Sequence, residues 1–342
     1  MTTSAPSAGQ VLVPLNRLGH LTRLAEGTQG VISRTDRLVL RHSEHAILKQ
    51  YKPAALSQLD ARGLTAMVEF LFSLPQAEGD RLLDYAAWPV RIVVDGAGPV
   101  GFVMPPVPQQ YWIDLTLPSG AVRRVLGQFQ HLLNADEFSA RKGLVVGDEV
   151  RVRLALSVAF RLEFLHARNV VVGDLSPRNL LFSIDPQPSC YFVDCDSMVL
   201  AGRSALPQLE TPDWHVRAVS REPLATEATD RYKLALLVLR LLSRGQSSYH
   251  TAELPDWSSP VLAPLIVAGL SADPAGRPTP AQWVNVLNQA KDLLAGPPVV
   301  YRPAHSPSGS QRGEPEPRIY TPPGSAFGGF SPVVSPPPSD GN

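Results

Sequence analysis

A polar loop between strongly apolar runs restricts the folds that this sequence can adopt. The apolar run 170–172 leads into the loop 173–179, the apolar run 180–182 follows it, and a further apolar run, 191–193, ends at Asp194. Asp174, Asn179 and Asp194 carry oxygen atoms that suit a hard cation, and Asp174 is also a candidate base. Each of these residues taken singly is common in turns. Their combination between such apolar strands predicts a functional site.

Two further features precede this loop along the chain. Gly27 and Gly30 lie between two predicted strands, where small residues allow a hairpin backbone to close over phosphate groups. Lys49 ends an apolar strand, where a buried ammonium group needs an anionic partner. An ordinary glycine turn and a surface lysine are the alternatives when each feature is taken alone.

Residues 11–104 alternate short apolar runs with turn residues, which is typical of an antiparallel sheet. We expect about five strands from the runs 21–24, 31–34, 37–40, 46–51, 90–94 and 100–104. One helix interrupts the sheet, because Ser57 and Asp60 resemble a capping box and apolar residues then recur at helical spacing up to Leu71. This region is predicted to be the smaller of two lobes.

The pattern becomes helical after the proline-rich residues 105–108. Helical periodicity covers 123–133, 148–166, 230–242, 261–270 and 280–294. The helix at 230–242 is apolar on nearly all sides, so we expect it at the centre of its lobe. The sequence therefore predicts a two-lobed α+β fold, with a sheet lobe at 11–104, a hinge at 105–108 and a mostly helical lobe at 109–295.

Charge and cysteine content exclude several classes of protein. The 31 Lys and Arg residues balance 31 Asp and Glu residues, so we expect neither a nucleic-acid partner nor a membrane partner. The longest apolar segments are much shorter than the ~18 residues of a membrane span. Cys190 and Cys195 are too few for a disulfide framework and lack the spacing of a zinc site. We expect a cytoplasmic protein in a reducing compartment.

Both ends of the chain are expected to be disordered. Twelve of the 34 prolines lie in residues 296–342, and this composition cannot bury enough apolar surface to offset its ordering entropy. Residues 1–10 are also predicted to be disordered. Four Ser/Thr-Pro pairs in the tail are candidate autophosphorylation sites that would recruit a phosphopeptide-binding partner, at Ser306, Thr321, Ser331 and Ser335.

In order and spacing, these features resemble those of the protein kinase superfamily. The resemblance implies that Asp174 is the catalytic base and that Asn179 and Asp194 are the metal ligands. It implies ATP and Mg²⁺ as cofactors, with Mn²⁺ as a substitute, and the hinge near Met104 to Val107 as the adenine site. The implied nucleotide-binding residues are Ala25, Gly27, Gly30, Ile32, Ile47, Lys49, Glu69, Met104 and Val107.

Within this set, Ala25 replaces the first of the three glycines that the family has in its phosphate loop. Lys49 matches the lysine that holds the α- and β-phosphates and also takes part in catalysis. Glu69, on the single predicted helix, is the expected ion-pair partner of that lysine. Asp230 matches an aspartate that braces the catalytic loop, and residues 271–279 resemble a segment near the end of the family's domain.

Several positions depart from the family pattern. Gly173 replaces the arginine that binds activation-loop phosphate, which argues against control by that route. Ser176 replaces a lysine that touches the transferred phosphate, and Arg178 is a candidate to supply that charge. Asp196 replaces a glycine and is expected to add a second carboxylate near the metal.

A buried glutamate that pairs with the late arginine of the family is also missing. That arginine corresponds to Arg277 here, and Glu222 is the candidate to replace its partner. The loss of the usual motif at residues 216–218 weakens the resemblance in this region.

Three functions stay open at this point. The first is ATP- and Mg²⁺-dependent phosphoryl transfer to Ser/Thr hydroxyls of a protein substrate, including the chain itself. The second is a catalytically silent, nucleotide-binding pseudokinase scaffold. The third is a small-molecule kinase, because the loop 173–179 also resembles that of aminoglycoside and choline kinases. A substrate pocket formed by residues 115–146 would favour the third.

Overall fold

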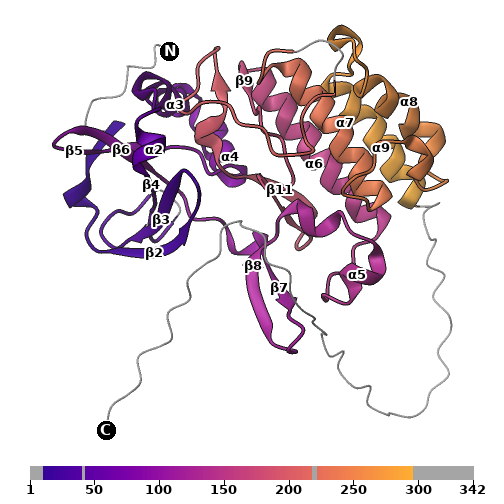
Figure 1. Ribbon diagram of the computed structural model, residues 1–342, viewed down its shortest axis with the longest axis horizontal. Helices are drawn as coiled ribbons and strands as arrows, with labels where there is room; N and C mark the ends of the chain where they lie inside the picture. The colour runs from indigo at the N-terminus through magenta and orange to yellow at the C-terminus, as the bar shows by residue number, and fades with distance from the viewer. Residues whose placement is uncertain (1–10, 41–42, 218–221, 296–342) are drawn as a thin grey trace.

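The structure is a computed structural model that describes residues 11–40, 43–217 and 222–295. The segments 1–10 and 296–342, for which disorder and the tail phosphorylation sites were predicted, lie outside the described residues. Figure 1 shows a sheet at one end of the molecule and a group of long helices at the other. This arrangement confirms the predicted two-lobed α+β fold, with an N-terminal sheet followed by a mostly helical region.

The smaller lobe contains a six-stranded sheet in the order β1-β5-β6-β4-β3-β2. Its strands are β1 (Leu12–Pro14), β2 (Leu21–Glu26), β3 (Gly30–Thr35), β4 (Ile47–Tyr51), β5 (Arg91–Asp95) and β6 (Gly98–Met104). Strand β1 is one more than expected and pairs with β5 in parallel, whereas the other neighbours are antiparallel. The predicted strand at 37–40 does not form, and only Leu40 makes a bridge, to Ser43.

Three helices, not one, accompany this sheet: α2 (Pro53–Leu56), α3 (Ala61–Ser73) and α4 (Gln76–Tyr85). The predicted capping box is replaced by a break between α2 and α3. Ser57 closes α2, and the Asp60 carboxylate accepts a hydrogen bond from the Arg62 amide to begin α3. Helix α4 has few buried apolar residues, so its sequence pattern is too weak to reveal it.

A β-hairpin follows the hinge where a helix was predicted at 123–133. A short 3₁₀ turn, η2 (Gln109–Tyr111), leads into β7 (Trp112–Thr116) and β8 (Val122–Leu126), and η3 (Phe129–Leu132) follows. The hairpin projects away from both lobes in Figure 1. Gly127 donates to the Tyr111 carbonyl and accepts from the Phe182 amide. These bonds fix an extended backbone at the point where the helix was expected to continue.

The larger lobe is built on long helices, as predicted. They are α5 (Asp136–Ala140), α6 (Asp148–His166), α7 (Glu227–Ser243), α8 (Ser259–Gly269) and α9 (Pro280–Ala295), with η5 (Thr251–Glu253) and η6 (Pro274–Gly276) between them. Helix α7 is buried on nearly all sides and packs against α6 and α8. Two short antiparallel pairs complete this lobe: β9 (Val170–Val171) pairs with β12 (Val199–Leu200), and β10 (Leu180–Ser183) forms a hairpin with β11 (Ser189–Phe192).

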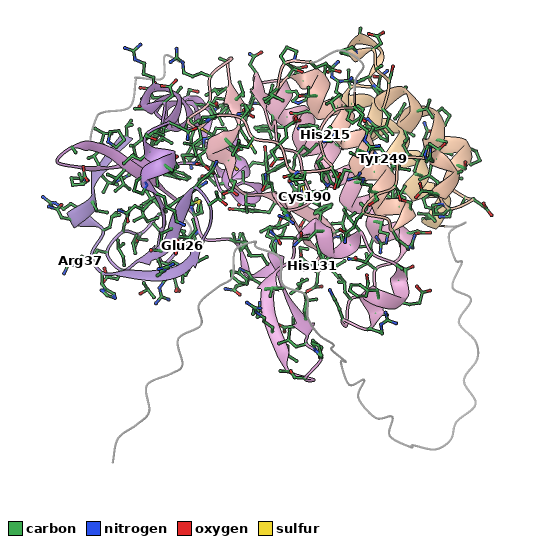
Figure 2. The ribbon with its side chains drawn as sticks, viewed as in Figure 1. Glu26, Arg37, His131, Cys190, His215 and Tyr249 are labelled. Carbon is green, nitrogen blue, oxygen red and sulfur yellow. The ribbon has the colours of Figure 1, made fainter. Side chains whose placement is uncertain are left out.

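Both cysteines are buried and unbridged. Figure 2 shows Cys190 inside the larger lobe, where the Arg161 guanidinium donates to its sulfur and the Ser157 hydroxyl accepts from its amide. No helix of the described residues is long and apolar enough to cross a membrane.

A buried ion pair ties the end of the larger lobe to α7. The Arg277 guanidinium donates to Glu222 through two bonds of 2.8 and 2.5 Å; the arginine side chain is fully buried and that of Glu222 is 9% exposed. The same guanidinium donates to the carbonyls of Ser271 and Ala228. Glu222 therefore replaces the glutamate that the family pattern places elsewhere.

Replacing Arg277 tests how much this ion pair contributes to the free energy of unfolding. Arg277→Met leaves the Glu222 carboxylate buried without its cation, and we expect the free energy of unfolding to fall by about 3–5 kcal/mol. Arg153→Met is the matched control, because Arg153 pairs with Glu149 on the exposed face of α6 and should lose less than about 1 kcal/mol. Urea unfolding followed by circular dichroism measures both. Equal losses in the two variants would contradict the assignment.

Candidate active site

Helix α7 fixes the backbone of the loop 173–179. The fully buried Asp230 carboxylate accepts hydrogen bonds from the amides of Val172 and Gly173, at 2.8 and 2.9 Å. The same carboxylate lies 2.9 Å from His166 Nε2 at the end of α6. Charge-assisted bonds of this kind are strong and directional. They hold the loop against the most buried helix of the molecule.

Gly173 is required by both conformation and space. Its φ of +75° is favourable only for glycine. A Cβ atom at this position would lie 2.3 Å from Gln208 Oε1 and 3.0 Å from Ala225 Cβ. A larger residue at position 173 would therefore have a strained backbone and would have to displace the Gln208 side chain.

Asp174 is the centre of a small hydrogen-bond network. Asn179 Nδ2 donates to Asp174 Oδ2 at 2.9 Å, and the Thr211 hydroxyl donates to the same oxygen at 2.9 Å. The Thr211 amide donates to Asp174 Oδ1, and its hydroxyl also lies 3.0 Å from the hydroxyl of the fully buried Ser176. The Arg178 side chain is exposed, and its role in supplying the charge lost at Ser176 stays a prediction.

Burial raises the pKa of Asp174 above its usual value. The bonds from Thr211, the charge of Lys233 and the bond from Asn179 partly oppose that shift. A carboxylate with a raised pKa is a better proton acceptor than an ordinary exposed aspartate.

Asp194 lies beside this pair at the end of β11. Its backbone adopts a left-handed conformation, with φ 54° and ψ 38°, and the Val193 amide donates to the Asn179 carbonyl. Asp174, Asn179 and Asp194 together line one pocket. Since Asn179 Nδ2 is bonded to Asp174, its Oδ1 is the atom that can join Asp194 as a ligand of a hard cation.

The described residues contain no cluster of three His, Cys, Asp or Glu side chains that could hold a metal ion unaided. Mg²⁺ is commonly held by one or two protein oxygens together with waters and substrate phosphates. The donor set of Asn179 and Asp194 fits that second kind of site.

The partner of Lys49 is not the predicted one. Lys49 Nζ lies 2.7 Å from Asp196 Oδ1 and 3.0 Å from Asp194 Oδ1, and only 2% of the lysine side chain is exposed. Glu69 is exposed on α3, so the prediction that it pairs with Lys49 is wrong. Helical spacing predicted the helix, but it could not show that Glu69 lies on the exposed face of that helix and away from Lys49.

Asp196 also differs from its expected role. Its carboxylate is fully buried, and its second oxygen accepts a hydrogen bond from the Tyr51 hydroxyl at 3.0 Å. Asp196 is therefore bonded to Lys49 and Tyr51 and is not an additional exposed carboxylate beside the metal ligands. Burial alone lowers the pKa of Lys49, but the carboxylates of Asp194 and Asp196 outweigh burial and raise it above its usual value.

The glycine loop closes over the same region. The Gly27 amide donates to the Gly30 carbonyl across the turn between β2 and β3, and a register shift precedes Ala25. A Cβ atom on Gly30 would lie 2.7 Å from the Gln50 carbonyl oxygen, so β4 approaches too closely for any larger residue. Gln29 at the turn lies 3.4 Å from Lys49 Nζ. Glu26 marks the end of β2 in Figure 2.

A cavity of about 240 Å³ brings these parts together. Its lining comes from the glycine loop, β4, the loop 173–179 and the segment after Asp194: Thr28, Gln29, Lys49, Asp174, Asn179, Asp194, Ser197, Pro207 and Leu209. The four residues predicted to act on phosphate, acceptor and metal thus meet in one space. No residue of the segment 115–146 lines this cavity.

The predicted adenine-side residues on the sheet share one face, but none of them lines the cavity. The register pairs Ile32 with Lys49 and Ile47 with Met104, so all four side chains lie on the same face of the sheet. Val107 carries the one backbone amide hydrogen between Pro105 and Pro108. Its carbonyl accepts from the Trp112 indole at 3.4 Å.

Sequence reasoning missed three residues of the site. Thr211 lies in residues 197–217, which we call the activation segment, and no local motif links it to Asp174. Lys233 follows Asp230 by three positions on α7, and its buried ammonium donates to the Gly173 carbonyl and pairs with Glu210 at 2.7 Å. Tyr51 could have been found, because residues two apart on a strand share a face.

Comparison with known proteins gives one distant match. No protein-family model matches the sequence. The serine/threonine/tyrosine-protein kinase HT1 of Arabidopsis thaliana is 27% identical over 161 residues, which make up 43% of this chain and 41% of that protein. The chain thus spans less than half the length of this relative. The matched part of the chain is thus distantly similar to a protein kinase.

Proposed function

We propose that this protein transfers the terminal phosphoryl group of ATP, with Mg²⁺, to Ser/Thr hydroxyls of protein substrates. The observation that carries the proposal is the single cavity lined by Lys49, Asp174, Asn179 and Asp194. A phosphate-binding cation, a base and two oxygen ligands for a metal are the parts that phosphoryl transfer requires.

The adenine of the nucleotide is proposed to bind against the face of the sheet that carries Lys49, on the side of the hinge. Ile32, Ile47 and Met104 share the face of the sheet that carries Lys49, and they form an apolar wall for a base. The Val107 amide is the donor that the hinge offers to adenine. Lys49 and the turn from Gly27 to Gly30 then hold the phosphates.

The residues of the loop 173–179 are proposed to act on the acceptor. Asp174 orients the incoming hydroxyl and takes its proton, while Asn179 and Asp194 hold Mg²⁺, which neutralises charge on the phosphates when bound. Most of the rate enhancement would come from positioning and from stabilisation of charge.

A protein acceptor is favoured by the environment of Asp174. The Thr211 hydroxyl donates to its carboxylate at 2.9 Å, so a threonine side chain of a polypeptide fits against the base. The segment 115–146 forms a projecting hairpin and the turns after it, and it does not line the cavity. That placement favours a protein acceptor over a small molecule.

Incubation with labelled ATP and Mg²⁺ tests the proposal, with a generic protein acceptor added. We expect wild-type protein to transfer label, and Asp174→Asn to lower the rate about 10²-fold or more because the base is lost. Asp292→Asn, an exposed carboxylate on α9, is the matched control and should keep the wild-type rate. Mass mapping of the labelled chain shows whether it phosphorylates itself.

A silent pseudokinase would give a different result in the same experiment. It would transfer no label but would melt at a higher temperature when ATP is added. That pair of results would overturn the proposed activity and leave nucleotide binding as the function.

The metal site has its own test. Asp194→Ala should abolish Mg²⁺-dependent turnover, because one of two protein ligands is removed, and chelation with EDTA should do the same to wild type. The fold should stay intact, since Lys49 keeps its bond to Asp196. Far-ultraviolet circular dichroism checks the fold. Wild-type turnover in this variant would remove Asp194 from the metal site.

Activity should not depend on phosphorylation of the activation segment. Lys233 and Glu210 already join this segment to α7 through an ion pair of 2.7 Å, and position 173 carries glycine in place of an arginine that could bind phosphate. Phosphatase-treated protein should therefore keep its initial transfer rate within about two-fold, a range set by ordinary surface-charge effects. A large loss of rate, restored by preincubation with ATP, would show that a phosphate is needed.

A further inference from the structure

The Lys49 ammonium has two carboxylate partners with different surroundings. Asp194 is 28% exposed and lines the cavity, whereas Asp196 is fully buried behind it. Both oxygens of Asp196 are occupied within the protein, one by Lys49 at 2.7 Å and one by the Tyr51 hydroxyl at 3.0 Å. Because Asp196 is fully buried and does not line the cavity, a cation in the cavity meets Asp194 and not Asp196.

Tyr51 and Lys49 are held by the same strand. They are two residues apart on β4 and so project from one face, and the Tyr51 ring packs against Phe102 on β6 at a centroid distance of 6.0 Å. The hydroxyl position is therefore set by the sheet. Asp196 accepts from two donors of one rigid strand, which fixes the carboxylate relative to the lysine.

We propose that Asp196, oriented by Tyr51, is the positioning residue for Lys49, and that helix α3 carries no part of this role. The proposal rests on the function proposed above for Lys49. Helix α3 turns Leu64, Met67 and Val68 into the core, and its Glu69 faces solvent. The anchor of the lysine thus comes from the chain just after Asp194.

Charge balance gives each carboxylate a separate task. If the Asp194 carboxylate binds a metal cation, Lys49 still needs a negative partner, because a buried ammonium without one is strongly unfavourable. Asp196 remains paired with Lys49 whether or not Asp194 binds a metal cation. A displacement of α3 would leave this pair intact, so lysine placement is independent of that helix.

A thermal double-mutant cycle tests the anchor without any need for activity. Lys49→Met leaves Asp196 buried without a cation and should lower the melting temperature by about 5 °C or more. Adding Asp196→Asn removes the stranded charge, so the double variant should melt above Lys49→Met alone. Glu69→Gln should have no effect in either background. A double variant that melts no higher than Lys49→Met, or a clear effect of Glu69→Gln, would overturn the anchor.

Kinetics test the positioning role. Asp196→Asn should lower kcat at saturating ATP about ten-fold or more, while the affinity for adenosine stays within two-fold, because the base site is untouched. Tyr51→Phe is the milder variant and should lower kcat several-fold with little change in melting temperature. Glu69→Gln should keep wild-type kcat. Wild-type kcat in Asp196→Asn, or parallel losses of kcat and adenosine binding, would contradict the role.

These experiments separate the two proposals. If wild-type protein transfers no phosphate, the proposed function fails, and the thermal cycle still decides whether Asp196 holds Lys49. If transfer occurs and the cycle shows no coupling between Lys49 and Asp196, the function stands and the positioning role is wrong.

Discussion

A lysine ammonium buried between the lobes is the constraint on which the site depends. Lys49 belongs to the sheet lobe, and its two partners, Asp194 and Asp196, belong to the chain that leaves β11 of the other lobe. An uncompensated charge at this depth would be strongly unfavourable, so the pairing fixes how the sheet faces the loop 173–179. The cavity then follows from that placement, lined by the glycine loop on the sheet lobe and by Asp174, Asn179 and Asp194 on the other lobe.

In the larger lobe, several contacts differ from those that the kinase resemblance implied, and other residues of the chain make them. The Gln208 side chain fills the space beside Gly173, and Lys233 joins the activation segment to α7 through Glu210. The missing glutamate is replaced by Glu222, which closes on Arg277. At Lys233 and at Arg277 a buried cation has an acidic partner. The same rule holds at Lys49.

Local patterns in the sequence predicted much of this structure. The helix at 148–166 has the predicted bounds, and α7 is the buried helix that an all-round apolar segment indicates. Asp174 and Asn179 lie close to Asp194 because the short strand that follows their loop, β10, pairs with the strand that precedes Asp194, β11. The hairpin at β7 and β8 was mistaken for a helix, since the backbone bonds of Gly127 to Tyr111 and Phe182 are tertiary. The partner of Lys49 was also missed, because an ion pair between residues 147 positions apart leaves no local signal.

The central claim is that Lys49, Asn179 and Asp194 form one site for ATP and its metal ion. A crystal structure with Mg²⁺ and a non-hydrolysable ATP analogue tests this most directly. We expect the cation at about 2.0–2.1 Å from Asn179 Oδ1 and an Asp194 carboxylate oxygen, with phosphate oxygens within hydrogen-bond distance of Lys49 Nζ. A nucleotide bound away from this cavity, or a cation that avoids both residues at saturating concentration, would contradict the account.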